Sequence, residues 1–87
     1  MSKVVWKYEL TPAIIIEMPR GAQILSVAEQ NNKICLWALV DPYAETEARE
    51  FHVFGTGHEI SIKSLNFVGT ALLNNAGLVF HVFEASY

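Results

Sequence analysis

The sequence predicts an all-β fold, a small sandwich or barrel of about seven antiparallel strands in a single domain over residues 1–87. Ile34–Val40 is a run of seven apolar residues, too short to cross a bilayer and suited to one strand buried on both faces. The other β-rich segments follow one another at turn spacings of about 8–12 residues. No stretch shows a long helical period, so the chain contains no predicted helical layer.

The first half of the chain divides into four predicted strands. Val4–Leu10 alternates, with Val4, Trp6, Tyr8 and Leu10 on the face that we expect to be buried. Thr11-Pro12 breaks this strand, because proline has no N–H for a ladder. The next strands are predicted at Ala13–Met18, Gln23–Glu29 and Ile34–Val40, with turns at Pro19–Gly21 and Gln30–Lys33. The Gln30–Lys33 turn predicts a hairpin, since Asn tolerates positive φ.

The second half begins with the only charged, alanine-containing stretch, Tyr43–Glu50, for which one or two helical turns and an ordered loop are equally compatible with the sequence. Apolar alternation then predicts strands and turns up to the C-terminal end. They are the strands Glu50–Phe54, Glu59–Ile62, Asn66–Leu72 and Leu78–Glu84, and the turns Gly55–His58 and Leu73–Gly77.

Composition limits the partners of this chain. Hydrophobic residues make up 52% and charged residues 17% of the 87 residues, a surplus that favours a homo-oligomer over a compact monomer with a rich core. The net charge is −3 and the six basic residues are scattered, which argues against a nucleic-acid surface. The N-terminal residues contain no long apolar segment, so we expect no membrane insertion and a cytoplasmic location.

The sequence predicts no catalytic residues, no metal and no cofactor. Cys35, the single cysteine, lies in the most apolar strand and is expected to be a core residue. His52, His58 and His81 lack the spacing of a local metal site, and we interpret His52 and His81 as hydrogen-bonded residues of a half-buried face. The carboxylates of Asp41, Glu45, Glu47 and Glu50 are expected on a solvated face.

Gly55-Thr56-Gly57-His58 is the best local candidate for a ligand site. Two glycines allow a backbone in which several N–H groups point towards one anion, with Thr56 and His58 as further donors. The alternative is a plain turn, and the missing lysine and third glycine exclude a Walker loop and a dinucleotide fingerprint. Trp6 and Tyr8, in an N-terminal strand that would be an edge, are candidates for an oligomer contact.

Four blocks in order resemble a family of short proteins found widely in bacteriophage genomes and prophages. These are Trp6–Leu10, Met18–Val27, Leu36–Pro42 and Phe54–His58, and the likeness extends from Trp6 to Phe83. The resemblance carries no assigned activity. It implies a small phage accessory protein that antagonises host defence, in the host cytoplasm if phage-encoded.

Phages also encode small oligomeric "sponge" proteins that capture nucleotide immune signals, and this chain is similar to them in size, acidic balance and apolar surplus. The likeness implies a non-enzymatic protein that sequesters a small anionic or nucleotide ligand. The amides of the Gly55–Gly57 loop would take a phosphate, Arg20 or Arg49 would neutralise charge, and Trp6 or Tyr8 would stack on a base. The alternatives are an inhibitor that binds a host protein through an apolar face or the acidic stretch Asp41–Glu50, and a small hydrolase or isomerase.

Overall fold

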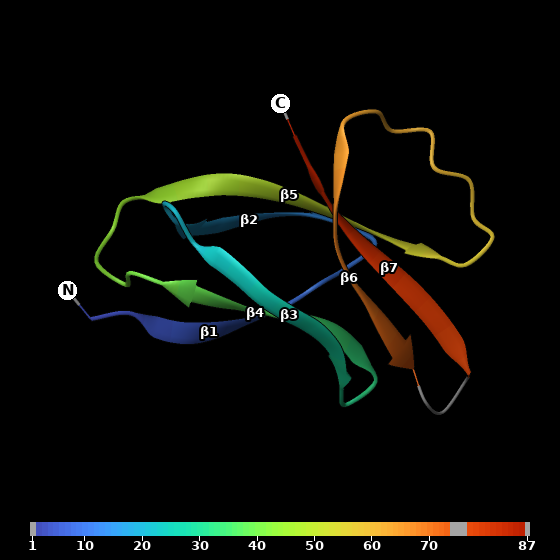
Figure 1. Cartoon of the computed structure of the whole chain (residues 1–87), viewed down its shortest axis with the longest axis horizontal. Coiled ribbons are helices and arrows are strands. Elements are labelled where there is room, and N and C mark those ends of the chain that lie inside the picture. The colour runs from blue at the N-terminus through green and yellow to red at the C-terminus, as the bar shows by residue number, and fades with distance from the viewer. Residues whose placement is uncertain (1, 74–76, 87) are drawn as a thin grey trace.

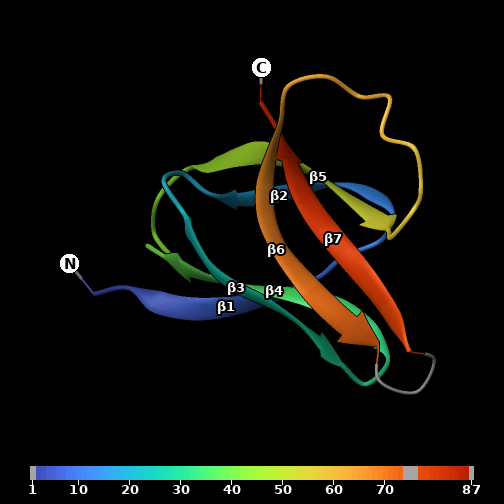
Figure 2. The ribbon, with the colours of Figure 1, turned by 45° about the vertical axis from the view of Figure 1, so that its right-hand side comes forward.

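Seven antiparallel strands in two sheets make up the computed structural model, which describes residues 2–73 and 77–86 (Figures 1 and 2). The strands are β1 (Val4–Glu9), β2 (Ala13–Pro19), β3 (Gln23–Gln30), β4 (Lys33–Val40), β5 (Thr46–Gly55), β6 (Leu65–Leu73) and β7 (Leu78–Ala85). One sheet has the order β1-β4-β3 and the other β2-β5-β7-β6. The predicted all-β class is confirmed. Within the described ranges, no helix has the length and apolarity that crossing a bilayer requires.

The first two strands pair with strands that are distant in the sequence. β1 and β2 pair with β4 and β5, not with each other, whereas β3–β4 and β6–β7 are hairpins. The β3–β4 turn has positive φ at Asn31 (54°) and Asn32 (63°), as a two-residue type I′ turn requires. The predicted turn before β3 also forms, because Gly21 takes a φ of 80° that the third position of a type II turn needs.

The core lies between the two sheets and takes side chains from both. β4 contributes Leu36, Ala38 and Val40, which are buried together with Met18, Phe51, Ala71 and Val82 of the other sheet. The apolar run is therefore the middle strand of its sheet, as predicted. Its second face is covered less completely, since Cys35 is buried there but Trp37 and Leu39 are half-buried.

The two sheets come closest where β3 lies beside β6 (Figure 2). Gly69 of β6 permits this approach, because a Cβ atom at that position would lie 3.1 Å from Cβ and Cγ2 of Val27. Both strands carry a β-bulge near this contact, between Ile24 and Ser26 in β3 and between Phe67 and Gly69 in β6. Bulges increase local twist, which brings the two sheet edges together.

Two expectations from the sequence need correction, and a third falls partly on residues that the structure does not describe. The stretch Tyr43–Glu50 is neither helical nor all loop, because β5 starts at Thr46 and pairs with β2, and a turn closed by Asp41 precedes it. Glu59–Ile62 is not a strand, since it lies in the long β5–β6 connection, where it has no strand to pair with. The predicted turn Leu73–Gly77 includes residues outside the described ranges.

The predicted buried face of β1 is covered only towards its C-terminal end. Tyr8 is half-buried and Leu10 buried, but Val4 and Trp6 remain 39% and 41% exposed. The reason is that β1 packs mainly against β4 of its own sheet, so that strands of the other sheet cover little of its face. The N-terminal half of β1 thus leaves apolar side chains open to solvent.

Candidate functional site

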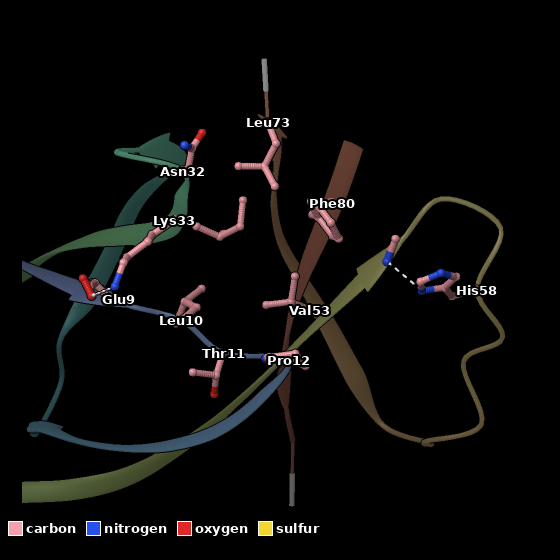
Figure 3. A pocket seen from close by; sticks show the side chains of 12 residues that line it. Glu9, Leu10, Thr11, Pro12, Asn32, Lys33, Val53, His58, Leu73 and Phe80 are labelled. Atoms are coloured by element: carbon pink, nitrogen blue, oxygen red, sulfur yellow. Dashed lines mark hydrogen bonds and ion pairs between the residues drawn. The ribbon is translucent and has the colours of Figure 1, made fainter. Parts of the chain in front are cut away.

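A cleft of about 450 Å³ opens at one end of the sandwich, between the β1–β2 connection, the β3–β4 turn and the ends of β5, β6 and β7 (Figure 3). Its walls are apolar, and Leu10, Val53, Leu73 and Phe80 project towards its centre from four different segments. The volume falls in the range of about 300–1,000 Å³ that small-molecule sites occupy. The cleft exists because these strand ends carry large apolar side chains that no other segment of the described chain covers.

Polar groups lie around the cleft. Glu9, Asn32 and Lys33 lie on one side and His58 on the other (Figure 3). Lys33 Nζ is 3.5 Å from Glu9 Oε1, and the two side chains are 62% and 50% exposed. An ion pair this exposed contributes about 0–1 kcal/mol, so a ligand anion can compete for the lysine at small cost.

The Gly55–His58 loop borders the cleft, but most of its amides already have partners. The N–H of Gly55 donates to His58 Nδ1, that of Thr56 to the carbonyl of Val79, and that of His58 to the carbonyl of Gly55. Gly57, with φ of 91°, needs glycine for its backbone conformation. The loop is therefore a hydrogen-bonded turn, and its link to the cleft runs through Gly55 and the His58 side chain.

The other two histidines lie on the outer face of the larger sheet, as hydrogen-bonded groups. His81 lies between two threonines, with Nε2 2.9 Å from Thr56 Oγ1 and Nδ1 3.1 Å from Thr70 Oγ1. His52 Nε2 is 2.5 Å from Glu50 Oε2. The expectation that hydrogen bonds satisfy His52 and His81 is confirmed, and Thr56 is directed to this face and not to the cleft.

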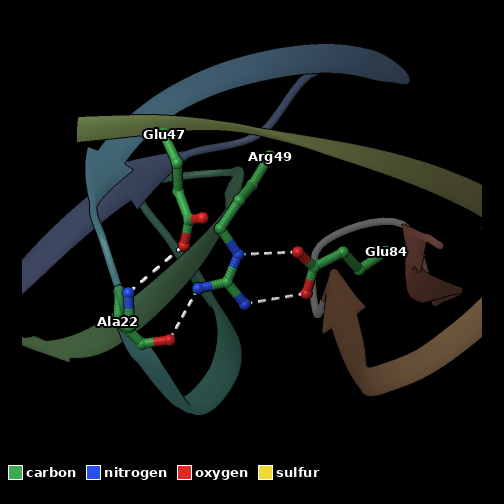
Figure 4. A network of polar contacts seen from close by, with 5 residues as sticks. Ala22, Glu47, Arg49 and Glu84 are labelled. Atoms are coloured by element: carbon green, nitrogen blue, oxygen red, sulfur yellow. Dashed lines mark hydrogen bonds and ion pairs between the residues drawn. The ribbon is translucent and has the colours of Figure 1, made fainter. Parts of the chain in front are cut away.

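Arg49 lies inside the sandwich, where three hydrogen bonds hold its guanidinium (Figure 4). Its Nε and Nη2 donate to the two carboxylate oxygens of Glu84 at 2.6 and 2.9 Å, and Nη1 donates to the carbonyl of Ala22 at 2.6 Å. The hydrogen bonds to Glu84 raise the pKa of the Arg49 guanidinium above its ordinary value. Arg49 thus joins β5, β7 and the start of β3, and it has a structural role in this arrangement.

Tyr8 points into the same interior. Its hydroxyl is buried and has no hydrogen-bond partner among the described residues. Burial raises the pKa of Tyr8, and the positive charge of Arg49 opposes that shift. The Tyr8 ring is therefore placed to pack in the core and not to stack on a ligand in the cleft.

Arg20 and Trp6 lie apart from the cleft. Arg20 is exposed in the β2–β3 turn, where its N–H donates to the carbonyl of Glu45, and Trp6 is exposed on β1. Of the eight residues that the sequence suggested for a ligand site, the structure brings Gly55 and His58 to the cleft and Tyr8 and Arg49 to the interior. The eight residues do not form one site.

The carboxylates of the acidic stretch Asp41–Glu50 also lie apart from one another. Asp41 Oδ1 accepts the N–H of Tyr43, Glu47 Oε2 accepts that of Gly21, and Glu50 contacts His52. They do not form one acidic face, because successive residues of β5 point to opposite sides of the sheet. In residues 2–73 and 77–86, no three His, Cys, Asp or Glu side chains are close enough to hold a metal ion.

Apart from Gly55 and His58, sequence reasoning missed the residues that line the cleft. Leu10, Val53 and Phe80 read as ordinary strand residues, and Lys33 as part of a polar turn. The one signal was their position at strand ends beside turns. That signal becomes informative only when the strand pairing shows which ends lie together.

The chain belongs to the family described as "Domain of unknown function (DUF7352)", whose family model matches residues 1–87. No curated protein and no solved structure matches the chain.

Proposed function

Since membership of this family assigns no activity, we propose from the geometry that the protein binds a small ligand in the end cleft without converting it. The observation that carries this proposal is the cleft itself, with apolar walls and a polar rim. Such a lining suits a ligand with a flat apolar body and one polar or anionic group.

Lys33 is the basic group that an anionic ligand would use. It is the one Lys or Arg side chain among the described residues that line this cleft, and its exposed pairing with Glu9 is weak. His58, across the cleft, can accept a hydrogen bond from an N–H or O–H group of the ligand when its Nδ1 exchanges the amide of Gly55 for that donor. A nucleotide has the required chemistry, with a base for the apolar walls and a phosphate for Lys33.

Sequestration of a nucleotide immune signal is the narrowest form of the proposal. Its support comes from the resemblance to bacteriophage proteins, together with the cleft. Binding without turnover is consistent with a rim in which Glu9 and Lys33 form an exposed ion pair and His58 lies across the cleft from both, which is not the arrangement of a nucleophile beside a base.

The test is native mass spectrometry of the purified protein with a panel of cyclic nucleotides and ADP-ribose derivatives. We expect one ligand to bind with unchanged mass. Val53→Phe, which fills the cleft, should weaken that binding by about tenfold or more, as the loss of one good apolar contact region does. Leu72→Phe adds the same kind of bulk to an exposed residue of β6 and should leave affinity unchanged.

A second pair of variants tests the charge. Lys33→Met should weaken an anionic ligand, whereas Lys63→Met, in the β5–β6 connection, should not. Equal binding by wild type and Val53→Phe would show that the ligand lies elsewhere, and a product mass after incubation would show an enzyme.

Inhibition of a host protein is the second candidate function, because the outer face of the larger sheet carries a cluster of three phenylalanine side chains. Phe83 makes edge-to-face contacts with Phe54 and Phe67, at centroid distances of 5.9 and 5.7 Å, and Phe67 is 62% exposed. Exposed aromatic residues of this kind anchor protein interfaces. Phe67→Ser would abolish capture of such a protein and leave nucleotide binding intact.

A further inference from the structure

The four edge strands of this sandwich differ in how they are protected against pairing with another chain. β3 and β6 carry bulges and lie against each other. β2 is preceded by Pro12, ends at Pro19 and contains Glu17. Prolines, charges and bulges are the usual means by which sheet edges avoid pairing. Three of the four edges are therefore protected.

β1 has none of these devices except two charged residues near its C-terminal end. The sequence from Val4 to Glu9 contains no proline, and its register with β4 runs without a bulge. Val4, Val5 and Trp6 are consecutive and are 39%, 53% and 41% exposed, so apolar surface is open on both faces of the strand. An edge of this kind is a template for a further strand.

The hydrogen-bonding groups that would take this strand can be identified. The N–H of Leu10 donates to the carbonyl of Ile34 at 2.8 Å, so the even-numbered residues of this segment direct their backbone groups to β4. In an antiparallel ladder alternate residues point to opposite neighbours. The N–H and C=O groups of Val5, Lys7 and Glu9 therefore point away from β4, to the free edge.

We propose that this edge pairs with β1 of a second copy of the chain. A twofold axis would place the two strands antiparallel and join two three-stranded sheets into one continuous sheet of six strands. Such an interface is self-complementary, because each copy supplies the same strand. It would cover the exposed apolar side chains of Val4, Val5 and Trp6 in both copies.

Charge selects the register. With Trp6 opposite Trp6 of the second copy, Val5 lies opposite Lys7, and Lys3 lies opposite Glu9, so opposite charges meet at both ends. Sliding the second strand in one direction would place Lys7 opposite Lys7 of the second copy, and sliding it in the other direction would place Lys3 opposite Lys7 of the second copy. The Trp6 register places no like charges opposite each other, and it pairs the aromatic rings where an antiparallel ladder brings side chains closest.

Val5→Pro tests the pairing, because it removes an N–H that points to the free edge and spares the ladder with β4. Sedimentation velocity over a concentration series should show a wild-type dimer. Val5→Pro should raise its dissociation constant by about tenfold or more, since two intermolecular hydrogen bonds are lost per dimer. Ile15→Pro is the matched control, because by the same alternation its N–H points to the free edge of β2; it should leave the dimer unchanged.

Amide hydrogen exchange of the wild type gives a second measurement that needs no variant. Protection of the Val5, Lys7 and Glu9 amides would support the proposal. Lys3→Glu, which sets two carboxylates opposite each other at each end, should also weaken the dimer. A wild-type monomer at about 100 μM, or a dimer that Val5→Pro leaves intact, would overturn pairing through β1.

Discussion

Replacing Arg49 by methionine removes the ion pair between β5 and β7 of the larger sheet, together with the hydrogen bond to Ala22 before β3, and leaves the carboxylate of Glu84 without its partner. The side chains of Arg49 and Glu84 are 17% and 21% exposed, so about four-fifths of each is shielded from water. Three hydrogen bonds are lost, two to Glu84 and one to the carbonyl of Ala22. Breaking a buried pair by removing one member costs about 3–5 kcal/mol.

Because some solvent reaches this pair, we expect Arg49→Met to lower the free energy of unfolding by about 3 kcal/mol, at the low end of that range. The whole domain should have about 4–13 kcal/mol at about 0.05–0.15 kcal/mol per residue. The melting temperature should therefore fall by about 12–24 °C, at about 4–8 °C per kcal/mol for a domain of this size.

Urea denaturation of four proteins isolates the interaction of the pair: wild type, Arg49→Met, Glu84→Leu and the double variant. The double variant leaves no unpaired charge, so we expect it to be more stable than Arg49→Met alone. Glu9→Gln, which breaks the exposed pair with Lys33, is the control and should cost less than about 1 kcal/mol. If the decreases in unfolding free energy of the two single variants simply add in the double variant, Arg49 and Glu84 do not stabilise the fold as a buried pair.

Two further predictions concern packing and pH. Gly69→Ala should cost about 1–3 kcal/mol in urea denaturation, because the new methyl group overpacks against Val27, and the cost should shrink in a Val27→Ala background; an equal cost in both backgrounds would contradict the close approach of β3 and β6. Burial raises the pKa of Cys35, so above about pH 9 the unfolded chain loses the thiol proton while the folded chain keeps it. Stability should therefore fall as the pH rises, by up to about 1.4 kcal/mol per pH unit from this thiol. Cys35→Ala should show a smaller slope between pH 8 and 10, and an unchanged slope would assign the loss to other groups.

Local chemistry made part of the fold predictable. The turn at Asn31-Asn32 and the one at Gly21 follow from residues that tolerate positive φ, and the structure has both. The middle position of Ile34–Val40 followed from its apolar faces. These predictions succeeded because each depends on neighbours in the sequence.

The pairing of β1 with β4 and of β2 with β5 could not be predicted in this way. Every strand here has an apolar face, so many pairings bury similar area, and the choice depends on packing between distant residues such as Val27 and Gly69. The cleft depends on that pairing. Arg49 illustrates the same limit, since a basic residue in a charged segment gave no indication that it would be held inside by Glu84.

The interleaved strand order also determines when each part of the chain can acquire structure. β1 and β2 must wait for β4 and β5, whereas the β3–β4 and β6–β7 hairpins need only their own turns. Local hairpins close in microseconds, and distant pairings form more slowly because a longer loop has to be closed first. During synthesis the N-terminal strands therefore emerge without a ladder, and β1 is fixed last on its sheet although it is made first.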